Sequence, residues 1–527
     1  MKDPECIRPD LPNLVDDYLN GKGEVGEFYA FSPNLKGTKK AAQQRQLVEV
    51  DRTLLVSVLS EQAERSRYSS ELTSEQISRL ADNDVFTITT GHQLCLLGGP
   101  MFFIYKILSV IRLSNMLAEE GIQTVPVYWM ASEDHDFEEV NHIFLKGEKF
   151  LWNKTSSGAV GRLNLDQLSD FKMNVARYFE HDKVKTETLK KMDELFDEDK
   201  TLAEAIRDFV YWLFARYGVV VIDADDKRLK QGFKDVMESE LFEQKAHRAM
   251  QQNAIRLNDL GYSAQVTPRE VNLFWLDKDY RSRIVTTTNG FATSDGEKHW
   301  TAEEMKKVLN SHPENLSPNV VMRPLYQEKI LPNLTYIGGP GELSYWLQLK
   351  GVFDAYHVFY PQVLLRDMAV ILDEKLSKRM AQLAVAPDEV YMDKDVLFNR
   401  LVRQDNEQEQ LINDTEKDVT EAMSQVISSL ASFDPSLEES AKAEQAKIQR
   451  RFDTLRKKVI RSSRKQNHTT ERRIEEFVAG IKPNGDPQER VANWLNFENH
   501  VTISKRLDEL LKQFNPYAVS LKIVSKK

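Results

Sequence analysis

Short apolar runs alternate with helical stretches along the first two thirds of the chain. The run at 84–90 (DVFTITT) is β-branched and apolar, which predicts a buried strand. Residues 102–121 have the length and apolar character of a buried helix, and another apolar run follows at 125–131. Together they predict a βαβ unit with parallel strands and a right-handed crossover. The polar motifs that follow the two strands therefore leave the same edge of a sheet.

Three later apolar runs extend this sheet. They are GVVVIDAD at 218–225, LTYIGG from 334 and HVFYPQVLL from 357. Strands that are apolar throughout and separated by helical stretches are typical of a doubly wound parallel sheet. Because such sheets bind ligands outside the carboxyl ends of their strands, at the topological switch point, we expect the site there.

The segments between the strands predict the domain organisation. Those near 146–215 and 227–330 exceed a simple crossover and are expected to form inserted subdomains. We therefore expect an α/β core at 1–372, a helical domain at 373–480, and a C-terminal segment at 481–527 that returns to the core.

The helical domain has coiled-coil spacing. Apolar residues recur at intervals of four, three and four in two arms: Val419, Met423, Val426 and Leu430, then Ile448, Phe452, Leu455 and Val459. The turn at 432–436 (SFDPS) would fold the arms into an antiparallel α-helical coiled-coil hairpin.

The two arms also carry complementary charges. Acidic residues dominate the first arm: Asp405, Glu407, Glu409, Asp414, Glu416, Asp418 and Glu421. Basic residues dominate the second: Lys447, Arg450, Arg451, Arg456, Lys457, Lys458 and Arg461. Two interpretations remain open, a solvated or zipper face and a patch that attracts a phosphate-bearing ligand or partner.

Charge and cysteine content narrow the class of protein. The formal charge of −10 argues against a general nucleic-acid binder, because affinity for phosphate backbones depends on clustered Lys and Arg. Cys6 and Cys95 are the two cysteines, which is typical of a reducing compartment. The opening decapeptide is charged, and Gly98, Gly99, Pro100 and Lys106 interrupt the apolar stretch 94–111. We expect a cytoplasmic protein that binds no membrane.

Two polar motifs follow the first two strands. In Thr89-Thr90-Gly91-His92-Gln93, glycine permits close backbone approach, and the polar side chains can bind an anion or exchange a proton. Helix capping is the alternative. In Glu133-Asp134-His135-Asp136, four adjacent ionisable groups would repel one another unless a ligand, metal or cation compensated them. Capping by Asp134 and Asp136 is again an alternative. A metal site that includes His142 is a weaker hypothesis, because the spacing matches no ligand motif, so no metal is predicted.

Three further segments carry polar or glycine-rich patterns. Residues 336–342 (YIGGPGE) would let backbone N–H groups surround an anion while Glu342 binds an amine or acts as a base, or would simply form a tight turn. Residues 265–283 place arginines among aromatic residues, which suits carboxylate, phosphate or a structural ion pair. Residues 482–490 (KPNGDPQER) form a polar turn that is expected to dock against the core or a ligand. Cys95 lies among leucines, which favours an inert thiol.

Taken in order, five motifs resemble one known family. They are TTGHQLCLLGGPMFFIYK, PVYWMASEDHDFEEVNH, YSAQVTPREVNLF, LSPNVVMRPLYQEKILPNLTYIGGPGELSYW and IKPNGDPQER. Their order, their spacing and the hairpin before the last resemble the bacillithiol-biosynthesis cysteine-adding enzymes, BshC, over about residues 84–495. Members of that family commonly have Gln at the position of His92, which favours hydrogen bonding there over proton transfer.

The resemblance implies a fold and a reaction. The fold is a Rossmann-like core with inserted connecting subdomains, similar to class I synthetases, and a coiled coil that forms a homodimer. The reaction is a ligation of L-cysteine to the glucosamine amine of glucosaminyl-malate, the last step to bacillithiol. Amide formation from a free carboxylate is uphill in water, so ATP is the natural activating reagent, through an acyl-adenylate. A clear class I lysine signature is missing.

Roles for individual residues follow from the motifs and this reaction. An anionic group would be held by Thr90, Gly91, His92 and Gln93. Proton transfer and orientation of amine or hydroxyl groups would fall to Asp134, His135 and Asp136, beside Glu133. A substrate end would meet Tyr336, Gly338, Gly339, Glu342 and Tyr345. The malate carboxylates or a phosphate would meet Arg269, Asn272 and Arg366. A nucleotide or an interdomain contact would involve Gln488, Glu489 and Arg490.

Two other classes of function fit the same pattern. One is a scaffold or sensor whose hairpin binds a partner while the crevice binds a small ligand. The other is a metal-dependent nucleotidyl or glycosyl transferase that uses the same crevice. Variants of Asp134 and His135 test the first alternative, and metal analysis tests the second.

Overall fold

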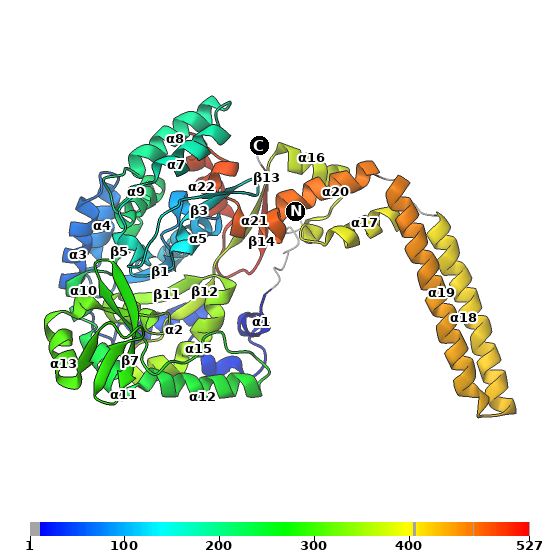
Figure 1. The fold of residues 1–527 in the computed structure, drawn as a ribbon, viewed down its shortest axis with the longest axis horizontal. Helices are drawn as coiled ribbons and strands as arrows, with labels where there is room; N and C mark the ends of the chain where they lie inside the picture. Colours follow the sequence, from blue (N-terminus) through cyan, green and yellow to red (C-terminus); the bar gives the residue numbers. More distant parts are fainter. Residues whose placement is uncertain (1–10, 404–406, 467, 526–527) are drawn as a thin grey trace. The chain divides into compact units, whose positions relative to one another are not determined.

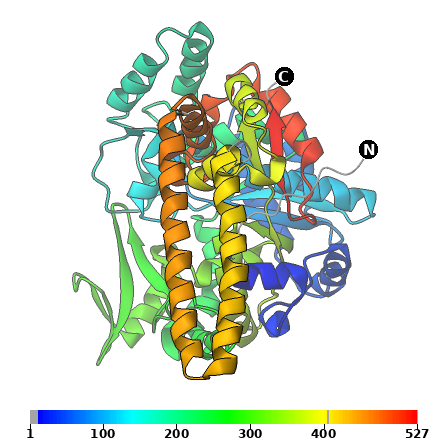
Figure 2. The ribbon, with the colours of Figure 1, turned by 90° about the vertical axis from the view of Figure 1, so that its right-hand side faces the viewer.

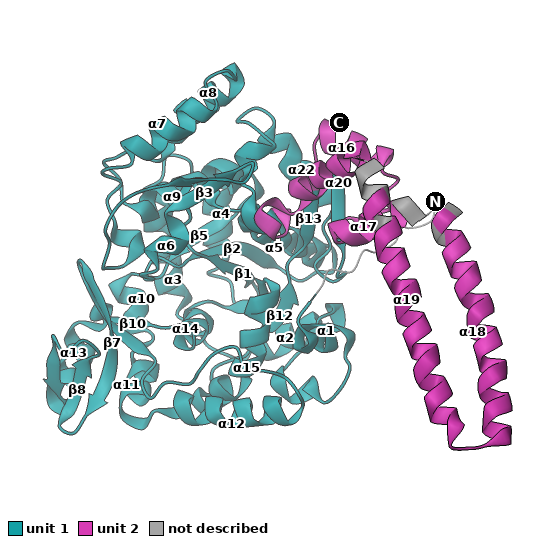
Figure 3. Cartoon of the chain, turned by 45° about the vertical axis from the view of Figure 1, so that its right-hand side comes forward, with its two compact units in different colours: residues 1–370, 489–524 teal, residues 371–488, 525–527 magenta. Residues whose placement is uncertain are grey.

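The structure is a computed structural model that describes residues 11–403, 407–466 and 468–525. It divides into two compact units (Figure 3). Unit 1 contains Met1–Val370 and Glu489–Val524, and unit 2 contains Ile371–Gln488 and Ser525–Lys527. Of the described helices, none combines the length and hydrophobicity that crossing a membrane requires.

A five-stranded parallel sheet forms the centre of unit 1, which confirms the predicted doubly wound sheet. Its strands in chain order are β1 (Phe86–His92), β2 (Thr124–Met130), β5 (Val220–Asp223), β11 (Asn333–Gly338) and β12 (Gln362–Leu365). Their spatial order is β12-β11-β1-β2-β5. Each strand overlaps the apolar run that predicted it, with bounds that differ by at most two residues except at the start of β12, because burial on both faces selects such runs.

The strand order places the topological switch point between β1 and β11. From β1 the chain moves outward through β2 to β5, and it then returns to add β11 and β12 on the other side of β1. The carboxyl ends of β1 and β11, at His92 and Gly338, lie at this point. Ligands of doubly wound sheets bind at such a position, because the connections diverge to opposite faces there.

Helices cover both faces of the sheet (Figure 1). Helix α5 (Phe102–Glu119) connects β1 to β2, and its Leu113 packs in a core with Ile88 of β1 and Ile337 of β11. Trp346 of α15 (Pro340–Tyr356) stacks on Tyr336 of β11, the neighbour of Ile337. Since successive side chains of a strand point to opposite faces, α5 and α15 lie on different faces.

The long segments between the strands contain secondary structure of their own. The first holds α6 (Phe137–Val140), β3 (His142–Leu145), β4 (Glu148–Leu151), α7 (Ser169–Tyr178), α8 (Lys183–Leu195) and α9 (Leu202–Phe214). The second holds α10 (Lys227–Gln231), α11 (Lys234–Glu243), α12 (Lys245–Asp259), α13 (Ala302–Ser311) and α14 (Met322–Ile330). It also holds an antiparallel sheet of order β10-β6-β7-β8-β9: β6 (Leu273–Asp277), β7 (Tyr280–Thr287), β8 (Gly290–Thr293), β9 (His299–Thr301) and β10 (Leu316–Pro318).

Further elements precede the sheet and follow it. The first four helices are α1 (Asn13–Asn20), α2 (Leu35–Arg45), α3 (Arg52–Glu64) and α4 (Glu71–Arg79). The C-terminal elements are α21 (Gln488–Val491), α22 (Ile503–Gln513) and β14 (Leu521–Ser525), which pairs with β13 (Met368–Leu372).

Unit 2 is helical and contains the predicted hairpin. Its helices are α16 (Glu374–Gln382), α17 (Lys394–Arg403), α18 (Glu407–Phe433), α19 (Leu437–Gln466) and α20 (His468–Ile481). Helices α18 and α19 lie side by side and are joined by a short turn (Figures 1 and 2). The antiparallel coiled-coil hairpin is therefore confirmed.

Two details of the predicted hairpin seam were wrong. Val426 is 46% exposed and Leu455 is 48% exposed, whereas Ile427 is partly buried. The seam therefore moves from Val426 to the next residue, because a helix of 3.6 residues per turn drifts away from a strict seven-residue repeat.

Where the structure describes them, the complementary charges of the two arms form few ion pairs with one another. Among the described side chains, one ion pair joins α18 to α19, between Glu416 and Arg456. The side chains of Asp405, Glu407 and Glu409 lie outside the described residues. Most of the other charged residues are exposed, as expected for the solvated face.

Candidate active site at the topological switch point

A buried lysine joins the carboxyl ends of β1 and β11. Lys106, one turn into α5, donates from Nζ to the Gly91 carbonyl oxygen at 2.8 Å and pairs with Glu342 Oε2 at 2.5 Å. The same Glu342 oxygen accepts from the Gly339 N–H at 2.8 Å, and Oε1 accepts from the Tyr336 hydroxyl at 2.6 Å. Four elements at the switch point are thus held by one ion pair.

The electrostatics keep this pair charged. Burial acts to raise the pKa of Glu342, but the Lys106 charge and the Gly339 N–H outweigh it, so the pKa is lowered. Burial lowers the pKa of Lys106, an effect that Glu342 opposes. A carboxylate with a lowered pKa and three bound donors is a weak base, so Glu342 is better suited to orientation than to proton abstraction.

A buried arginine, Arg366, and a partly buried one, Arg323, add positive charge beside this pair. The Arg323 guanidinium of α14 lies 5.6 Å from the Tyr336 ring centre, and its Nη1 donates to Gln327 at 3.0 Å. Arg366, after β12, forms a two-pronged pair with Glu489 at 2.6 and 3.1 Å. The Nη2 of Arg323 and the Nε of Arg366 have no hydrogen-bond partner among the described residues. Buried N–H donors without acceptors are costly, which indicates that a ligand supplies the acceptors. We call Lys106, Arg323, Tyr336, Glu342 and Arg366 the switch-point cluster.

The first polar motif lines the same point. His92 stacks on Phe102 at 4.9 Å, and its Nε2 has no partner among the described residues. Burial, followed by the charges of Lys106 and Arg366, places the pKa of His92 well below its usual value, so the ring is neutral. The Thr90 hydroxyl, in contrast, donates to the Ile337 carbonyl at 2.7 Å and joins β1 to β11. His92 therefore faces the site as a neutral hydrogen-bonding group, whereas Thr90 is structural.

The motif after β2 connects to the first through Gln93. The Gln93 amide donates to Asp134 Oδ2 at 2.6 Å, and Asp134 Oδ1 accepts from the His135 backbone N–H at 2.7 Å. Although burial opposes it, the contact with the His135 ring, the charge of Arg281 and these two bonds hold the pKa of Asp134 well below its usual range. Arg281 of β7 also reaches the His135 ring, with 2.6 Å between Nη1 and Nδ1. The second inserted segment thus contributes directly to the site at the strand ends.

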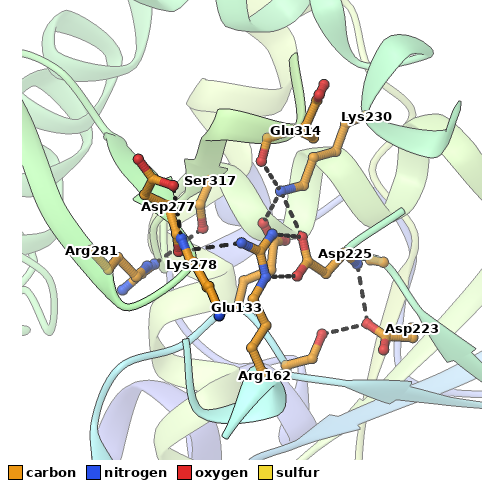
Figure 4. Close-up of polar contacts among 12 residues, drawn as sticks. Glu133, Arg162, Asp223, Asp225, Lys230, Asp277, Lys278, Arg281, Glu314 and Ser317 are labelled. Atoms are coloured by element: carbon orange, nitrogen blue, oxygen red, sulfur yellow. Dashed lines mark hydrogen bonds and ion pairs between the residues drawn. The ribbon is translucent and has the colours of Figure 1, made fainter. Parts of the chain in front are cut away.

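Glu133 belongs to a separate buried set of charges, drawn in Figure 4. The Lys230 ammonium of α10 is 1% exposed and lies 2.6 Å from Glu133 and 3.1 Å from Asp225. It also donates to the Glu314 carbonyl oxygen at 3.0 Å. Arg162 binds both oxygens of Asp225, at 2.7 and 2.9 Å. We call Glu133, Arg162, Asp225 and Lys230 the strand-end network.

The strand-end network joins both inserted segments to the sheet. Glu133 follows β2 and Asp225 follows β5, whereas Arg162 and Lys230 belong to the first and second insertions. Burial would lower the pKa of Lys230, but the charges of Glu133 and Asp225 outweigh it and raise the pKa. The cation is therefore fully compensated inside the protein.

Other predicted site residues have different surroundings. Asp136 is exposed and caps α6 by accepting from the Glu139 N–H at 3.3 Å. Asn272 is buried, and its side chain bonds to Glu240 and Asn319. Gln488 bonds to the Ile371 backbone at 2.8 and 3.0 Å within unit 2. Each of these groups has a structural role.

The remaining predicted residues differ in exposure. Arg269 and Arg490 are exposed, whereas Tyr345 is partly buried near Arg323. Gly338 ends β11, and Gly339 precedes α15. An ideal Cβ on Gly91 would lie 3.6 Å from the Tyr336 hydroxyl and 3.7 Å from Arg323 Nη1, so the glycine leaves space beside the cluster.

Sequence reasoning missed four charged residues that complete these sets. They are Lys106, Arg162, Arg323 and Lys230. The available signal was a lone lysine inside the apolar stretch of α5, one turn beyond the switch point. In the part of the chain that the structure describes, no three His, Cys, Asp or Glu side chains are gathered so that they could hold a metal ion.

Comparison with known proteins identifies the family. Residues 5–367 match the model of the bacillithiol biosynthesis BshC N-terminal Rossmann-like domain, and residues 369–525 match that of the BshC C-terminal coiled-coil domain.

Relatives cover almost the whole chain. Proteins of Flavobacterium johnsoniae and Cytophaga hutchinsonii, each named "Putative cysteine ligase BshC", are both 35% identical. The first match covers 97% of this chain and 97% of the relative, and the second covers 97% of this chain and 96% of the relative. A Bacillus cereus protein of the same name is 27% identical, over 91% of this chain and 92% of its own length. The chain therefore belongs to the BshC family of bacillithiol biosynthesis, with both of that family's domains.

Proposed function

We propose that this chain forms the amide bond between the carboxyl group of L-cysteine and the glucosamine amine of glucosaminyl-malate, the last step of bacillithiol biosynthesis. Family membership makes it a cysteine-adding ligase of that pathway. The acceptor and the bond formed are the finer part of the proposal, and they are supported by the chemistry of the switch-point cluster.

The excess positive charge of this cluster is the observation that carries the proposal. Lys106 and Arg366 are buried cations and Arg323 is a partly buried one, and the carboxylates of Glu342 and Glu489 pair with Lys106 and Arg366. The cations exceed the carboxylates by one, and donors on Arg323 and Arg366 have no acceptor among the described residues. A carboxylate substrate satisfies both requirements, and each of the two proposed substrates carries one or more carboxylates.

Activation of the cysteine carboxylate is the second part of the proposal. We assign it to ATP, whose phosphates are compatible with Lys106, Arg323 and the N–H donors of the cluster. ATP would convert the carboxylate into an acyl-adenylate with a good leaving group. The residues of this chain would orient the two substrates for reaction, exclude water and place hydrogen-bond donors beside the reacting carbonyl oxygen.

The test is turnover by the purified full-length chain with cysteine, glucosaminyl-malate and ATP. We expect the amide product by mass spectrometry, together with pyrophosphate. Amide formation without nucleotide consumption would overturn the adenylate, and absence of any amide would overturn the ligase. Product formation that is lost on chelation would instead favour metal-dependent chemistry.

A matched pair of variants separates catalysis from the scaffold alternative. Asp134→Asn removes the negative charge that lies beside Gln93 and Arg281. We expect this variant to abolish product formation while the protein stays folded. Loss of bacillithiol in cells only when residues 407–466 are deleted, and not in Asp134→Asn, would favour a scaffold.

We also propose that the protein is a cytoplasmic homodimer that associates through α18 and α19. The apolar Leu411, Val426 and Leu455 are more than 45% exposed on this hairpin, and a second hairpin would cover them. Light scattering of the full chain and of a Val426→Glu/Leu455→Glu variant tests this, because only the variant should be monomeric.

A further inference from the structure

The His135 ring has two polar neighbours at one nitrogen. Its Nδ1 lies 2.6 Å from Arg281 Nη1 and 3.3 Å from Asp134 Oδ1. A guanidinium can only donate hydrogen bonds, and a carboxylate can only accept them. The two neighbours therefore demand opposite states of Nδ1, and the shorter contact is to the donor.

Asp134 has two hydrogen-bond donors besides the His135 ring. Its Oδ2 accepts from the Gln93 amide at 2.6 Å, and its Oδ1 accepts from the His135 backbone N–H at 2.7 Å. Arg281 adds its charge at 3.6 Å from Oδ1. Since two N–H donors and the charge of Arg281 already serve the carboxylate, a proton on His135 Nδ1 is not required.

Arg281 is fixed in place independently of His135. Its side chain is 5% exposed, and its guanidinium carbon lies 3.9 Å above the ring centre of Phe274. A planar guanidinium stacked on an aromatic ring has few alternative orientations. The arginine therefore presents Nη1 to the imidazole as a preset donor.

We propose that Arg281 is a positioning residue that keeps His135 neutral, with its proton on Nε2, so that His135 acts as a hydrogen-bond donor and not as the general base. This inference rests on the proposed function, because it assigns His135 to the reacting group of that reaction. The ring accepts from Arg281 through Nδ1 and donates through Nε2 to the carbonyl oxygen of the activated cysteine. His135 transfers no proton. In the ligation itself, the amine nitrogen bonds to the cysteine carbonyl carbon, and the bond from that carbon to the leaving group breaks.

This arrangement suits stabilisation of developing negative charge. Both polar contacts of the ring within the described residues involve Nδ1, which leaves Nε2 for a ligand. The His135 side chain is 46% exposed, so a substrate can reach it. A prearranged donor gains strength as charge grows on the oxygen, and removal of one such donor typically lowers kcat by about 100-fold or more.

The state of the ring can be read directly in the full-length protein. With 15N-labelled histidine, two-bond correlation NMR distinguishes a ring protonated on Nε2 from one protonated on Nδ1, and His135→Gln identifies the signal. We expect the Nε2-protonated form in the wild type and in Arg281→Lys, which keeps a donor. In Arg281→Met we expect the proton to shift toward Nδ1, where Asp134 can accept it. Protonation of Nδ1 in the wild type would overturn the inference.

Kinetics separate positioning from a general loss of structure. We expect Arg281→Met to lower kcat about 100-fold, with a smaller change in KM, and Arg281→Lys to recover part of the loss. Arg256→Met makes the same chemical change at an exposed arginine of α12 and should leave kcat unchanged. If Arg281→Met fails to fold, the spectra of the wild type and of Arg281→Lys still show which ring nitrogen of His135 carries the proton. An Nε2-protonated His135 in a protein that forms no amide would refute the proposed function while leaving the assigned ring state intact.

Discussion

The switch-point cluster and the strand-end network are built from the same kinds of residues but are satisfied differently. Both contain buried cations and carboxylates that lie at carboxyl ends of the parallel sheet. In the strand-end network, two carboxylates meet two cations. In the switch-point cluster the cations exceed their carboxylates, and N–H donors have no acceptor among the described residues.

This difference separates structure from function at one edge of the sheet. A balanced network of buried charges gains little net stability, but loss of one member is costly because it leaves another charge unpaired. An unbalanced cluster carries that cost permanently unless a ligand completes it. The strand-end network is therefore expected to hold the insertions to the sheet, and the switch-point cluster is expected to hold substrate.

The largest expected effect is on stability, from Lys230→Met. This change leaves Glu133 and Asp225 without their shared cation, and we expect the free energy of unfolding to fall by about 3–5 kcal/mol. Lys227→Met is the matched control on the same helix, because Lys227 is 56% exposed and its pair with Glu314 should contribute less than about 1 kcal/mol. Denaturant titration measures both. Equal, small losses would show that the strand-end network does not hold the insertions.

Next comes an effect on activity, from Arg323→Met. Among the described residues no carboxylate forms an ion pair with Arg323, so its loss should leave no unpaired buried carboxylate. We expect kcat/KM to fall by about 100-fold to 1,000-fold, because a preset cation is removed from the site. Lys329→Met in the same helix is the exposed control. If Arg323→Met instead loses as much stability as Lys230→Met, without a specific loss of activity, the switch-point cluster would be structural like the strand-end network.

A smaller effect is expected from Gly91→Ala. The added methyl group makes only ordinary contacts with Tyr336 and Arg323, so the fold should be retained. It occupies space beside the cluster, and we expect KM for one substrate to rise by about tenfold, which corresponds to about 1.4 kcal/mol. Gly341→Ala meets nothing within 4 Å and serves as the control. Unchanged KM values would place the substrate elsewhere.

The smallest effect is expected from Asp136→Asn. Asn is as good a helix cap as Asp, so stability should be retained. Because Asp136 is exposed and caps α6, we expect activity to remain within about twofold of the wild type, in contrast to Asp134→Asn. Steady-state rates of the two variants provide the comparison. A large loss of activity in Asp136→Asn would show that this residue takes part in catalysis.

Much of the fold could be predicted because its signals are local. The β-branched run that became β1 and the apolar stretch that became α5 each carry their own periodicity, and the order of the runs implies parallel strands. The hairpin of α18 and α19 followed from spacing alone. Its seam was misplaced at Val426, because a helical repeat of 3.6 cannot be read as a fixed heptad over many turns.

The candidate site was predictable only in part. Glu133 and Asp134 are neighbours in the sequence, yet Glu133 pairs with Lys230, and Asp134 bonds to Gln93. The spacing of Glu133 and Asp134 does not predict which partner each one has, because each partner comes from a distant segment. Arg323 had no local signal at all.

By itself, the sequence determined the doubly wound sheet, the edge at which its polar motifs gather, the helical hairpin and a resemblance that its full-length relatives confirm. The tertiary structure alone decided which charges are paired. It placed Lys106 between Gly91 and Glu342, left one donor each of Arg323 and Arg366 without an acceptor among the described residues, and set Arg281 against the His135 ring. The physical reason is that hydrophobic patterning acts along the chain, whereas the balance of a buried charge depends on whatever segment the fold brings within a few ångströms.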